Sequence, residues 1–296
     1  ESGAASNLRD YIANMVYVGV LVRMLNIDLD AIHQALDFHF KGKKKAIDSN
    51  FNIIQSAADW AKENLEKRDP YSVEPMNKTD GFIMAEGNLA SALGAIFGGV
   101  QFVGWYPITP ASSLAETMNE YLPRFRKDPD TGKQTYVVVQ AEDELAAIGM
   151  AIGAGFAGLR SMSSTSGPGM SLMSEYLGLA YYSEVPVVVV NVQRVGPSTG
   201  LPTRTAQADI TQAYFHSHGD KNFILLLPGS VTECFEFGWK AFDIAERLQT
   251  PVIILTDLDL GMNVWITDSF EYPEKPIDRG KVLSSEDLQR LGKSWG

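Results

Sequence analysis

The sequence of 296 residues contains a single cysteine, Cys234. One thiol excludes an internal disulfide framework, and it excludes an iron–sulfur cluster held by this chain alone, because such clusters need about four thiolates. Cys234 stands in an apolar helical stretch beside Phe235 and Phe237, which predicts a small core residue. Since no signal peptide is recognisable either, we expect a reducing, cytoplasmic location.

Positive charge is also scarce. The chain has 25 Lys and Arg against 36 Asp and Glu, a formal net charge of -11, which argues against a nucleic-acid-binding surface. Its densest basic run, residues 41–45, is short, and we expect a solvated edge there. No apolar run reaches the length of about 18 residues that a membrane-spanning helix needs. We therefore expect neither nucleic acid nor a membrane as a partner.

The sequence is rich, by contrast, in apolar segments that alternate between strand and helix patterns. With 45% hydrophobic residues the chain can bury a sizeable core. The predicted strands are Phe82–Ala85, Phe102–Trp105, Tyr136–Val139, Ser161–Thr165, Val187–Val192, Phe223–Leu227 and Val252–Leu255. This alternation predicts an α/β fold from about residue 81 to 262, a doubly wound, mostly parallel sheet with helices on both faces.

A helical segment precedes this region. Apolar residues from Met15 to Leu25 recur at a spacing of three and four, with a break near residues 26–28 and more helix to Leu65. Without a strand of its own, the segment must pack on something else, either a missing part of a domain or a partner. Because the chain begins with Glu instead of Met, we expect a processed or partial polypeptide. The expected division is a helical segment over 1–68, a Pro-containing linker over 69–80, an α/β domain over 81–262, and a tail or the start of a further domain over 263–296.

A cluster of acids, Glu142, Asp143 and Glu144, follows the predicted strand Tyr136–Val139. Open parallel sheets bind ligands at the carboxyl ends of their strands, so a cofactor that needs one acidic contact could bind there. The acids could equally favour the positive end of a helix macrodipole. The next helix is so rich in Ala and Gly that we expect another surface to approach it closely.

Three loops at predicted strand ends carry polar groups. In the first, residues 106–113, hydroxyls and backbone N–H groups at a helix start would suit an anion, although Pro110 and a nearby hydroxyl are also ordinary helix-start signals. The second, Thr165-Ser166-Gly167-Pro168-Gly169, is a tight turn that lets backbone approach a ligand, and it is neither a Walker loop nor a dinucleotide fingerprint. The third, residues 193–204, carries two arginines that could clamp carboxylates or form surface ion pairs.

Taken in order, the Tyr-Pro-Ile-Thr-Pro loop, the acid cluster, the Thr-Ser-Gly-Pro-Gly turn and the arginine loop resemble the alpha subunit of 2-oxoacid:ferredoxin oxidoreductases. The helical segment is similar to the end of the gamma domain, which two-subunit members carry fused ahead of alpha. The resemblance implies a thiamine diphosphate pyrimidine-binding domain over 81–262. It also implies oxidative decarboxylation of a 2-oxo acid, 2-oxoglutarate being favoured by the gamma–alpha order, with coenzyme A to acyl-CoA, carbon dioxide and reduced ferredoxin.

The resemblance also implies roles for individual residues. Glu144 is the acid expected at the pyrimidine ring, where a sheltered carboxyl can share a proton with N1′, and Glu142 is the reserve choice. Thr109 and Arg194 are expected to hold the substrate carboxylate. The remaining assignments are Arg204 to a distal carboxylate, Tyr106 and Ser113 to the pocket lining, Gly167 and Gly169 to the cofactor, His218 near the cofactor and His216 to structure.

Two features of a complete thiamine enzyme are missing from the sequence. There is no convincing Gly-Asp-Gly to Asn segment for a magnesium diphosphate, and there are no cluster cysteines. The resemblance therefore implies a beta subunit that brings Mg2+ and a [4Fe-4S] cluster, with the active site formed between chains and no metal site on this one.

Two other interpretations stay open. The chain could be the pyrimidine-binding subunit of another thiamine enzyme, of the transketolase or decarboxylase type, and an iron–sulfur subunit in the complex would exclude this. It could also be a non-catalytic α/β scaffold subunit, which full activity after a Glu144→Gln substitution would support.

Overall fold

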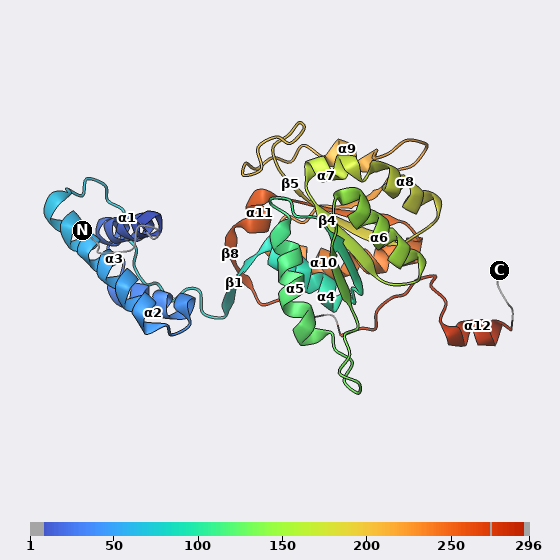
Figure 1. Ribbon diagram of the computed structural model, residues 1–296, viewed down its shortest axis with the longest axis horizontal. Helices are drawn as coiled ribbons and strands as arrows, with labels where there is room; N and C mark the ends of the chain where they lie inside the picture. The colour runs from blue at the N-terminus through green and yellow to red at the C-terminus, as the bar shows by residue number, and fades with distance from the viewer. Residues whose placement is uncertain (1–8, 273, 293–296) are drawn as a thin grey trace. The chain divides into compact units, whose positions relative to one another are not determined.

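The computed structural model describes residues 9–272 and 274–292 (Figure 1). The chain divides into two compact units, one up to Asp80 and one from Gly81 onward. Within the described ranges, no helix combines the length and the apolar character that crossing a membrane requires.

The first unit is helical, as predicted. It consists of α1 (Arg9–Leu25), α2 (Leu29–Phe40) and α3 (Lys44–Asn64). The predicted break is confirmed: Asn26 has a left-handed φ of 55°, and the Asp28 carboxylate caps α2 by accepting from the Asp30 N–H. A second break, which the sequence pattern did not indicate, separates α2 from α3 at Lys41 and Gly42, both with positive φ. The buried core of this unit is small, since α2 contributes no fully buried residue.

The predicted linker has no regular secondary structure, but its first part is attached to the helices. The Val73 N–H donates to the Leu25 carbonyl at 2.7 Å, and the Lys67 ammonium donates to the carbonyls of Met24 and Tyr71. These bonds fix the chain against the end of α1 as far as Val73.

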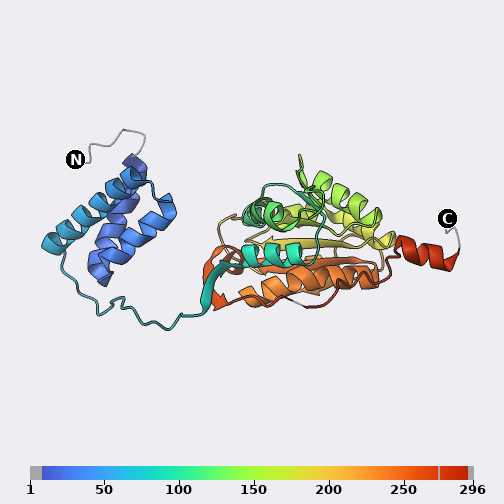
Figure 2. The ribbon, with the colours of Figure 1, turned by 90° about the horizontal axis from the view of Figure 1, so that it is seen from below.

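The second unit is a doubly wound α/β fold, which confirms the predicted fold class. Its six-stranded sheet is parallel throughout, in the order β3-β2-β4-β5-β7-β6. The strands are β2 (Phe102–Trp105), β3 (Val137–Gln140), β4 (Ser161–Thr165), β5 (Val187–Gln193), β6 (Ile224–Leu226) and β7 (Pro251–Asp257). Figure 2 shows the sheet between two helical layers.

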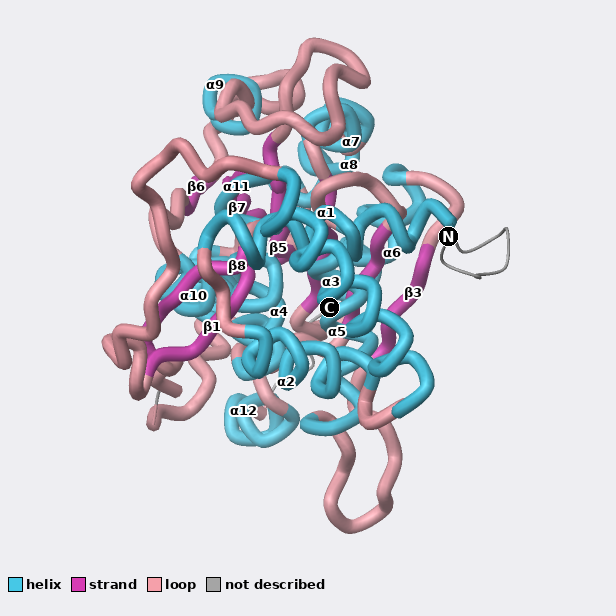
Figure 3. Tube along the Cα trace, turned by 90° about the vertical axis from the view of Figure 1, so that its left-hand side faces the viewer, coloured by secondary structure: helices cyan, strands magenta, loops and turns pink. Residues whose placement is uncertain are grey.

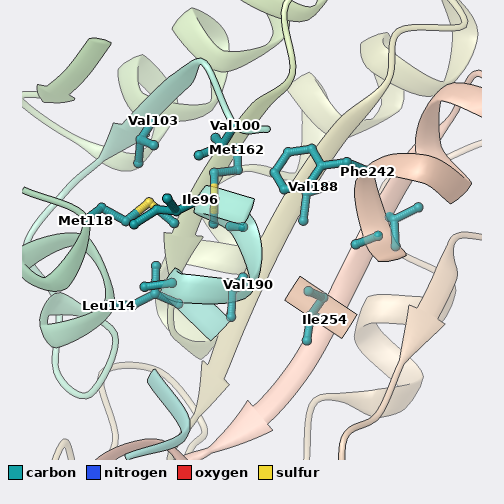
Figure 4. Packing of buried hydrophobic residues seen from close by; sticks show 14 of the residues in the cluster. Ile96, Val100, Val103, Leu114, Met118, Met162, Val188, Val190, Phe242 and Ile254 are labelled. Carbon is teal, nitrogen blue, oxygen red and sulfur yellow. The ribbon is translucent and has the colours of Figure 1, made fainter. Parts of the chain in front are cut away.

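Each face of the sheet has its own apolar core. Cluster residues place α4 (Gly87–Phe97), α5 (Ser112–Phe125) and α10 (Val231–Leu248) on one face and α6 (Glu144–Phe156), α7 (Gly167–Leu172) and α8 (Ser174–Tyr182) on the other. Figure 4 shows the first core, where Leu114 and Met118 of α5 meet Val103 and Val190 of the sheet. Cys234 of α10 is fully buried as expected, and burial raises the pKa of its thiol to about 12, so it is a core residue.

The prediction that residues 82–85 join the main sheet is wrong. Strand β1 (Phe82–Glu86) pairs antiparallel with β8 (Val264–Asp268) in a separate two-stranded sheet, in which Met84 lies opposite Ile266 (Figure 3). An apolar run predicts a strand but not its partner, and β8 lay in the segment assigned to a tail. The predicted boundary at 262 therefore differs from the structure.

Residues after β8 also pack on the α/β unit. The Asp278 carbonyl accepts from Arg160 at 2.8 Å, and the Lys281 N–H donates to the Glu246 carbonyl of α10 at 3.4 Å. The last described helix, α12 (Ser285–Leu291), begins with a capping box at Ser284 and has no buried residue.

Arg160, at the start of β4, is the centre of a buried ion cluster. Its side chain is 1% exposed and donates to the carboxylates of Asp243 and Glu246 of α10 at 2.7–2.9 Å. It also donates to the carbonyls of Gly98 at 2.6 Å and Asp278 at 2.8 Å. One guanidinium thus joins the sheet, the end of α4, α10 and the segment after β8. This ion cluster lies at the edge where the parallel strands begin, opposite to their carboxyl ends.

The expected close approach to the Gly-rich helix α6 is found at two of its glycines. A Cβ at Gly155 would lie 2.6 Å from the Pro186 carbonyl oxygen, and one at Gly149 would lie 3.2 Å from the Tyr176 ring. Gly153 of the same helix, by contrast, has no atom within 4 Å of such a Cβ.

A matched pair of substitutions tests this kind of packing. Gly94 of α4 faces α10, where an added methyl would overlap the Phe235 carbonyl oxygen and lie 3.1 Å from the Gly238 Cα. We expect Gly94→Ala to lower the free energy of unfolding by about 1–3 kcal/mol, because backbone cannot give way cheaply. Gly153→Ala should instead raise it by about 0.5–1 kcal/mol, because Ala favours the helix. Urea denaturation measures both, and equal effects would contradict this account of the α4–α10 contact.

Candidate active site

The acid cluster and all three polar loops begin at one edge of the sheet. Because β2, β3, β4 and β5 are parallel, the segments that follow them leave from the same side. The segments concerned are residues 106–111, 141–143, 166 and 194–209. This edge is therefore the candidate site.

Glu144, at the start of α6, is the sheltered acid of the cluster. It is 7% exposed, whereas Glu142 and Asp143 are exposed. Asp143 caps the helix by accepting from the Ala146 N–H at 2.7 Å, so the ordinary helix-start role belongs to Asp143. Among the described residues no hydrogen-bond donor is found for the Glu144 carboxylate. A buried, unpaired carboxyl at a ligand-binding edge supports the choice of Glu144 over Glu142.

The glycines of the Thr165–Gly169 turn leave space that side chains of this chain occupy. A Cβ at Gly169 would overlap the Thr165 hydroxyl and lie 3.0 Å from Glu144 Oε1. A Cβ at Gly167 would lie 3.1 Å from Asp209 Oδ2. These glycines thus make room for two carboxylates beside the turn, and contact with a cofactor stays a prediction.

Arg194 joins the first and third loops. The side chain directly follows β5 and is 5% exposed; its Nη1 donates to the Thr109 carbonyl at 2.6 Å and its Nη2 to the Thr199 carbonyl at 2.8 Å. Burial lowers the pKa of the guanidinium, and the negative charge of Glu144 opposes this shift. The structure therefore brings Thr109, Arg194 and Glu144 together, although Arg194 meets the carbonyl of Thr109 instead of its hydroxyl.

The first loop is hydrogen-bonded to a buried residue of α4 that the sequence did not indicate. Asn88 of α4 is fully buried, and its Nδ2 donates to the Pro110 carbonyl at 2.9 Å and to the Ser113 hydroxyl at 2.8 Å. Ser113 is thus engaged by Asn88, and Tyr106 is half-buried at the start of the loop. An amide within an apolar, Ala- and Gly-rich helix was the only signal that could have identified Asn88.

The third loop walls a pocket of about 650 Å³. The pocket is lined by Gly167 and Pro168 at the turn, by Arg194 to Thr199 in the loop, and by Ser171, Leu172, Ala208, Asp209 and Gln212. Asp209 is a further residue that the sequence analysis missed. Both loops contain a cis peptide bond, Thr109–Pro110 in the first and Gly196–Pro197 in the third.

Other predicted site residues lie apart from this group. Arg204 is exposed, and its Nη1 donates to the neighbouring Thr203 carbonyl at 3.0 Å. The His218 side chain is 87% exposed and faces Glu175 at 3.7 Å, in a different pocket. His216 is buried near Phe223, and burial lowers its pKa, which agrees with a structural residue.

Several buried polar atoms at this edge have no partner among the described residues. They are Trp105 Nε1 at the end of β2, Ser166 Oγ after β4, Asn191 Oδ1 on β5 and Arg194 Nε. Native proteins pair most buried polar groups, so these unpaired atoms are candidates for contact with a ligand, and one of them, Arg194 Nε, belongs to a residue that lines the pocket. A buried acid suits a ring nitrogen, and a guanidinium with an unpaired N–H suits a carboxylate, so the site could hold both kinds of group.

Comparison with known proteins shows the family of this chain. The family model described as "Pyruvate flavodoxin/ferredoxin oxidoreductase, thiamine diP-bdg" matches residues 93–271, and a model described as "Pyruvate ferredoxin/flavodoxin oxidoreductase" matches residues 2–60. The alpha subunit of 2-oxoacid:ferredoxin oxidoreductase 1 from Sulfurisphaera tokodaii is 38% identical over 294 residues, covering 95% of this chain and 45% of that protein.

The names of two further relatives refer to 2-oxoglutarate. The 2-oxoglutarate synthase subunit KorA from Methanothermobacter thermautotrophicus is 48% identical over 176 residues, covering 60% of this chain and 44% of that protein. The solved 2-oxoglutarate:ferredoxin oxidoreductase from Magnetococcus marinus, with 2-oxoglutarate, coenzyme A and succinyl-CoA bound, superposes with a TM-score of 0.78 at 35% identity, covering 95% of this chain and 48% of that one. The chain spans less than half the length of each of these proteins.

Proposed function

Because this chain belongs to the family of pyruvate flavodoxin/ferredoxin oxidoreductases and contains its thiamine diphosphate-binding domain, we propose that it acts as the alpha subunit of a cytoplasmic 2-oxoacid:ferredoxin oxidoreductase. The enzyme oxidatively decarboxylates a 2-oxo acid with coenzyme A and passes the electrons to ferredoxin. The observation that carries the proposal is the buried, unpaired Glu144 carboxylate beside an arginine that already contacts Thr109. The α/β unit from Gly81 onward, matched by the family model over residues 93–271, contains the pyrimidine-binding region. The helical segment is the end of a gamma-like domain, in line with the match over residues 2–60.

We assign the roles at the site as follows. Thiamine diphosphate, when bound, supplies an electron sink for decarboxylation. Glu144, which is 7% exposed, exchanges a proton with the pyrimidine N1′. Arg194 and Thr109 bind the carboxylate of the 2-oxo acid, since a guanidinium and a hydroxyl together orient one anion.

The remaining residues have outer roles in this proposal. Tyr106 and Ser113 line the site, and Gly167 and Gly169 face the cofactor. Arg204, in the third loop, binds the distal carboxylate of a bound dicarboxylate substrate. His218 is the weakest of these assignments on geometry, because it is exposed beside Glu175. A beta subunit supplies the Mg2+ diphosphate site and the [4Fe-4S] cluster, because this chain has a single, buried cysteine.

We favour 2-oxoglutarate as the substrate. The printed names of KorA and of the Magnetococcus marinus enzyme both refer to it, and a second arginine in the third loop is compatible with a dicarboxylate. The proposal is tested by purifying the intact complex, recording its visible spectrum and measuring coenzyme A-dependent dye reduction with a panel of 2-oxo acids. We expect iron–sulfur absorption and the highest kcat/KM with 2-oxoglutarate. A colourless complex that still uses thiamine diphosphate would instead support a transketolase or decarboxylase type.

A further inference from the structure

The loop between β5 and α9 (Ile210–Tyr214) is fixed by the last residue of β5. The Gln193 side chain is 2% exposed and lies between the loop and the neighbouring strand β7. Its Oε1 accepts from the Asp209 N–H at 3.0 Å, and its Nε2 donates to the Thr256 carbonyl at 3.0 Å. Gln193 therefore connects Asp209, at the end of the loop, to strands β5 and β7 of the sheet.

A second buried amide of β5 holds the same loop residue. Asn191 is fully buried and lies two positions before Gln193, so both side chains point to one face of the sheet. Its Nδ2 donates to Asp209 Oδ2 at 3.0 Å. Asp209 is thus held through its backbone by Gln193 and through its side chain by Asn191, and we call these three residues the loop clamp.

The loop clamp lies next to the residue that would bind substrate. Arg194 directly follows Gln193 and leads into the loop, where it donates to the Thr199 carbonyl. Within the loop, the Val195 N–H donates to the Arg204 carbonyl at 3.0 Å and the Leu201 N–H to the Val195 carbonyl at 2.9 Å. The loop is therefore a compact body with one end at Arg194 and the other at Asp209, and the Gln207 side chain adds a bond to the Asp257 carboxylate. Release of Asp209 would remove the two bonds that Gln193 and Asn191 supply at the second end.

We propose that Gln193 and Asn191 are positioning residues that preset this loop, so that Arg194 meets the carboxylate of the 2-oxo acid without reordering the chain. The inference rests on the proposed function for its substrate. Ordering a mobile loop at the moment of binding costs affinity, whereas a preset loop avoids that cost. Because neither amide touches the reacting atoms, the clamp acts on substrate binding more than on the chemical step.

The first test measures steady-state kinetics of the assembled enzyme carrying Gln193→Ala. We expect KM for the 2-oxo acid to rise about tenfold or more, the equivalent of one or two lost hydrogen bonds, while kcat changes by less than about threefold. Asp209→Ala, which removes the acceptor for Asn191, should raise KM in the same way. Asp209→Asn keeps a side-chain oxygen there and should restore a KM near that of the wild type.

The second test needs no turnover. Amide hydrogen exchange of residues 194–209 in the same complex should become about tenfold faster in Gln193→Ala, because the loop opens locally more often. The matched control is Gln101→Ala, at the opposite edge of the sheet, where Oε1 also accepts a backbone N–H, that of Arg160, at 3.3 Å. It should leave exchange in the loop unchanged.

The results separate the clamp from the proposed function. Unchanged KM and unchanged loop exchange in Gln193→Ala would overturn the clamp, as would a fall in kcat alone. If Gln193→Ala fails to fold, the comparison of Asp209→Ala with Asp209→Asn decides the question by the same two measurements. If the wild-type complex turns over no 2-oxo acid, the proposed function fails, while exchange of the loop still tests the clamp.

Discussion

Replacing Glu144 with glutamine is expected to lower kcat of the assembled enzyme by about 10²–10⁴-fold, the usual contribution of a proton-transferring side chain. Glutamine keeps the size of the side chain beside Gly169, where there is no spare room. It cannot, however, exchange a proton with a ring nitrogen, because an amide has no second protonation state in the working pH range. The measurement is 2-oxo acid-dependent dye reduction by wild-type and variant complexes prepared in the same way.

The neighbouring acid offers a control for this substitution. Glu142 lies two residues earlier and is exposed, so Glu142→Gln changes the charge of the segment without touching the sheltered position. It should retain activity within about twofold, as surface substitutions usually do. Full activity of Glu144→Gln would support the interpretation of the chain as a non-catalytic scaffold. Loss of activity in Glu142→Gln alone would move the catalytic assignment to the reserve acid.

The largest effect on stability is expected at Arg160. Arg160→Met should lower the free energy of unfolding by about 3–5 kcal/mol, because it removes the only buried cation that binds the buried carboxylates of Asp243 and Glu246 in the described part of the chain. Asp243 and Glu246 are 10% and 3% exposed and both bind this guanidinium. Glu246 keeps a second cation, Arg279, at 3.0 Å, and Asp243 keeps Lys275 at 3.8 Å, but these two side chains are 37% and 54% exposed and do not replace a buried guanidinium. Urea denaturation of the full chain, followed by tryptophan fluorescence, measures the change.

A surface ion pair provides the matched control. Arg124 of α5 binds Glu120 at 2.6 Å, and both side chains are 58% exposed. Arg124→Met should therefore cost less than about 1 kcal/mol, since water replaces an exposed partner cheaply. Adding Asp243→Asn and Glu246→Gln to Arg160→Met should recover part of the stability, because the uncompensated charges are removed. Equal losses in Arg124→Met and Arg160→Met would contradict the importance of burial.

The four central strands of the sheet, β2, β4, β5 and β7, could be predicted from the sequence. β2 and β4 have the predicted bounds, and β5 and β7 differ by two residues or fewer at each end. β5 and β7 contain the continuous apolar runs that are typical of strands buried on both faces. β4, with the sequence Ser-Met-Ser-Ser-Thr, is buried without such a run, and the Gly-containing turn that follows it is its clearer signal. β1 also contains an apolar run, but its pairing with β8 depends on a contact between distant segments, which periodicity in one strand cannot specify.

At the candidate site, too, the sequence indicated residues at strand ends but not the contacts between distant segments. Glu144, Thr109 and Arg194 could be placed together because each lies in the segment that follows a parallel strand, and such strands share an edge. Asn88, Gln193 and Asp209 could not be found in this way. A buried amide in an apolar segment is recognisable as unusual, but its partners are set by folding. The exposed position of His218 was equally beyond a motif comparison.

The pairing of β1 with β8 has a consequence for synthesis on the ribosome. Phe82–Glu86 leaves the ribosome long before Val264–Asp268, and at about 5–20 residues per second the delay is about 10–40 s. During that time Phe82 and Met84, which stay largely exposed even in the finished fold, have unpaired backbone beside them. A chaperone that recognises extended apolar segments can bind this nascent stretch until β8 is available.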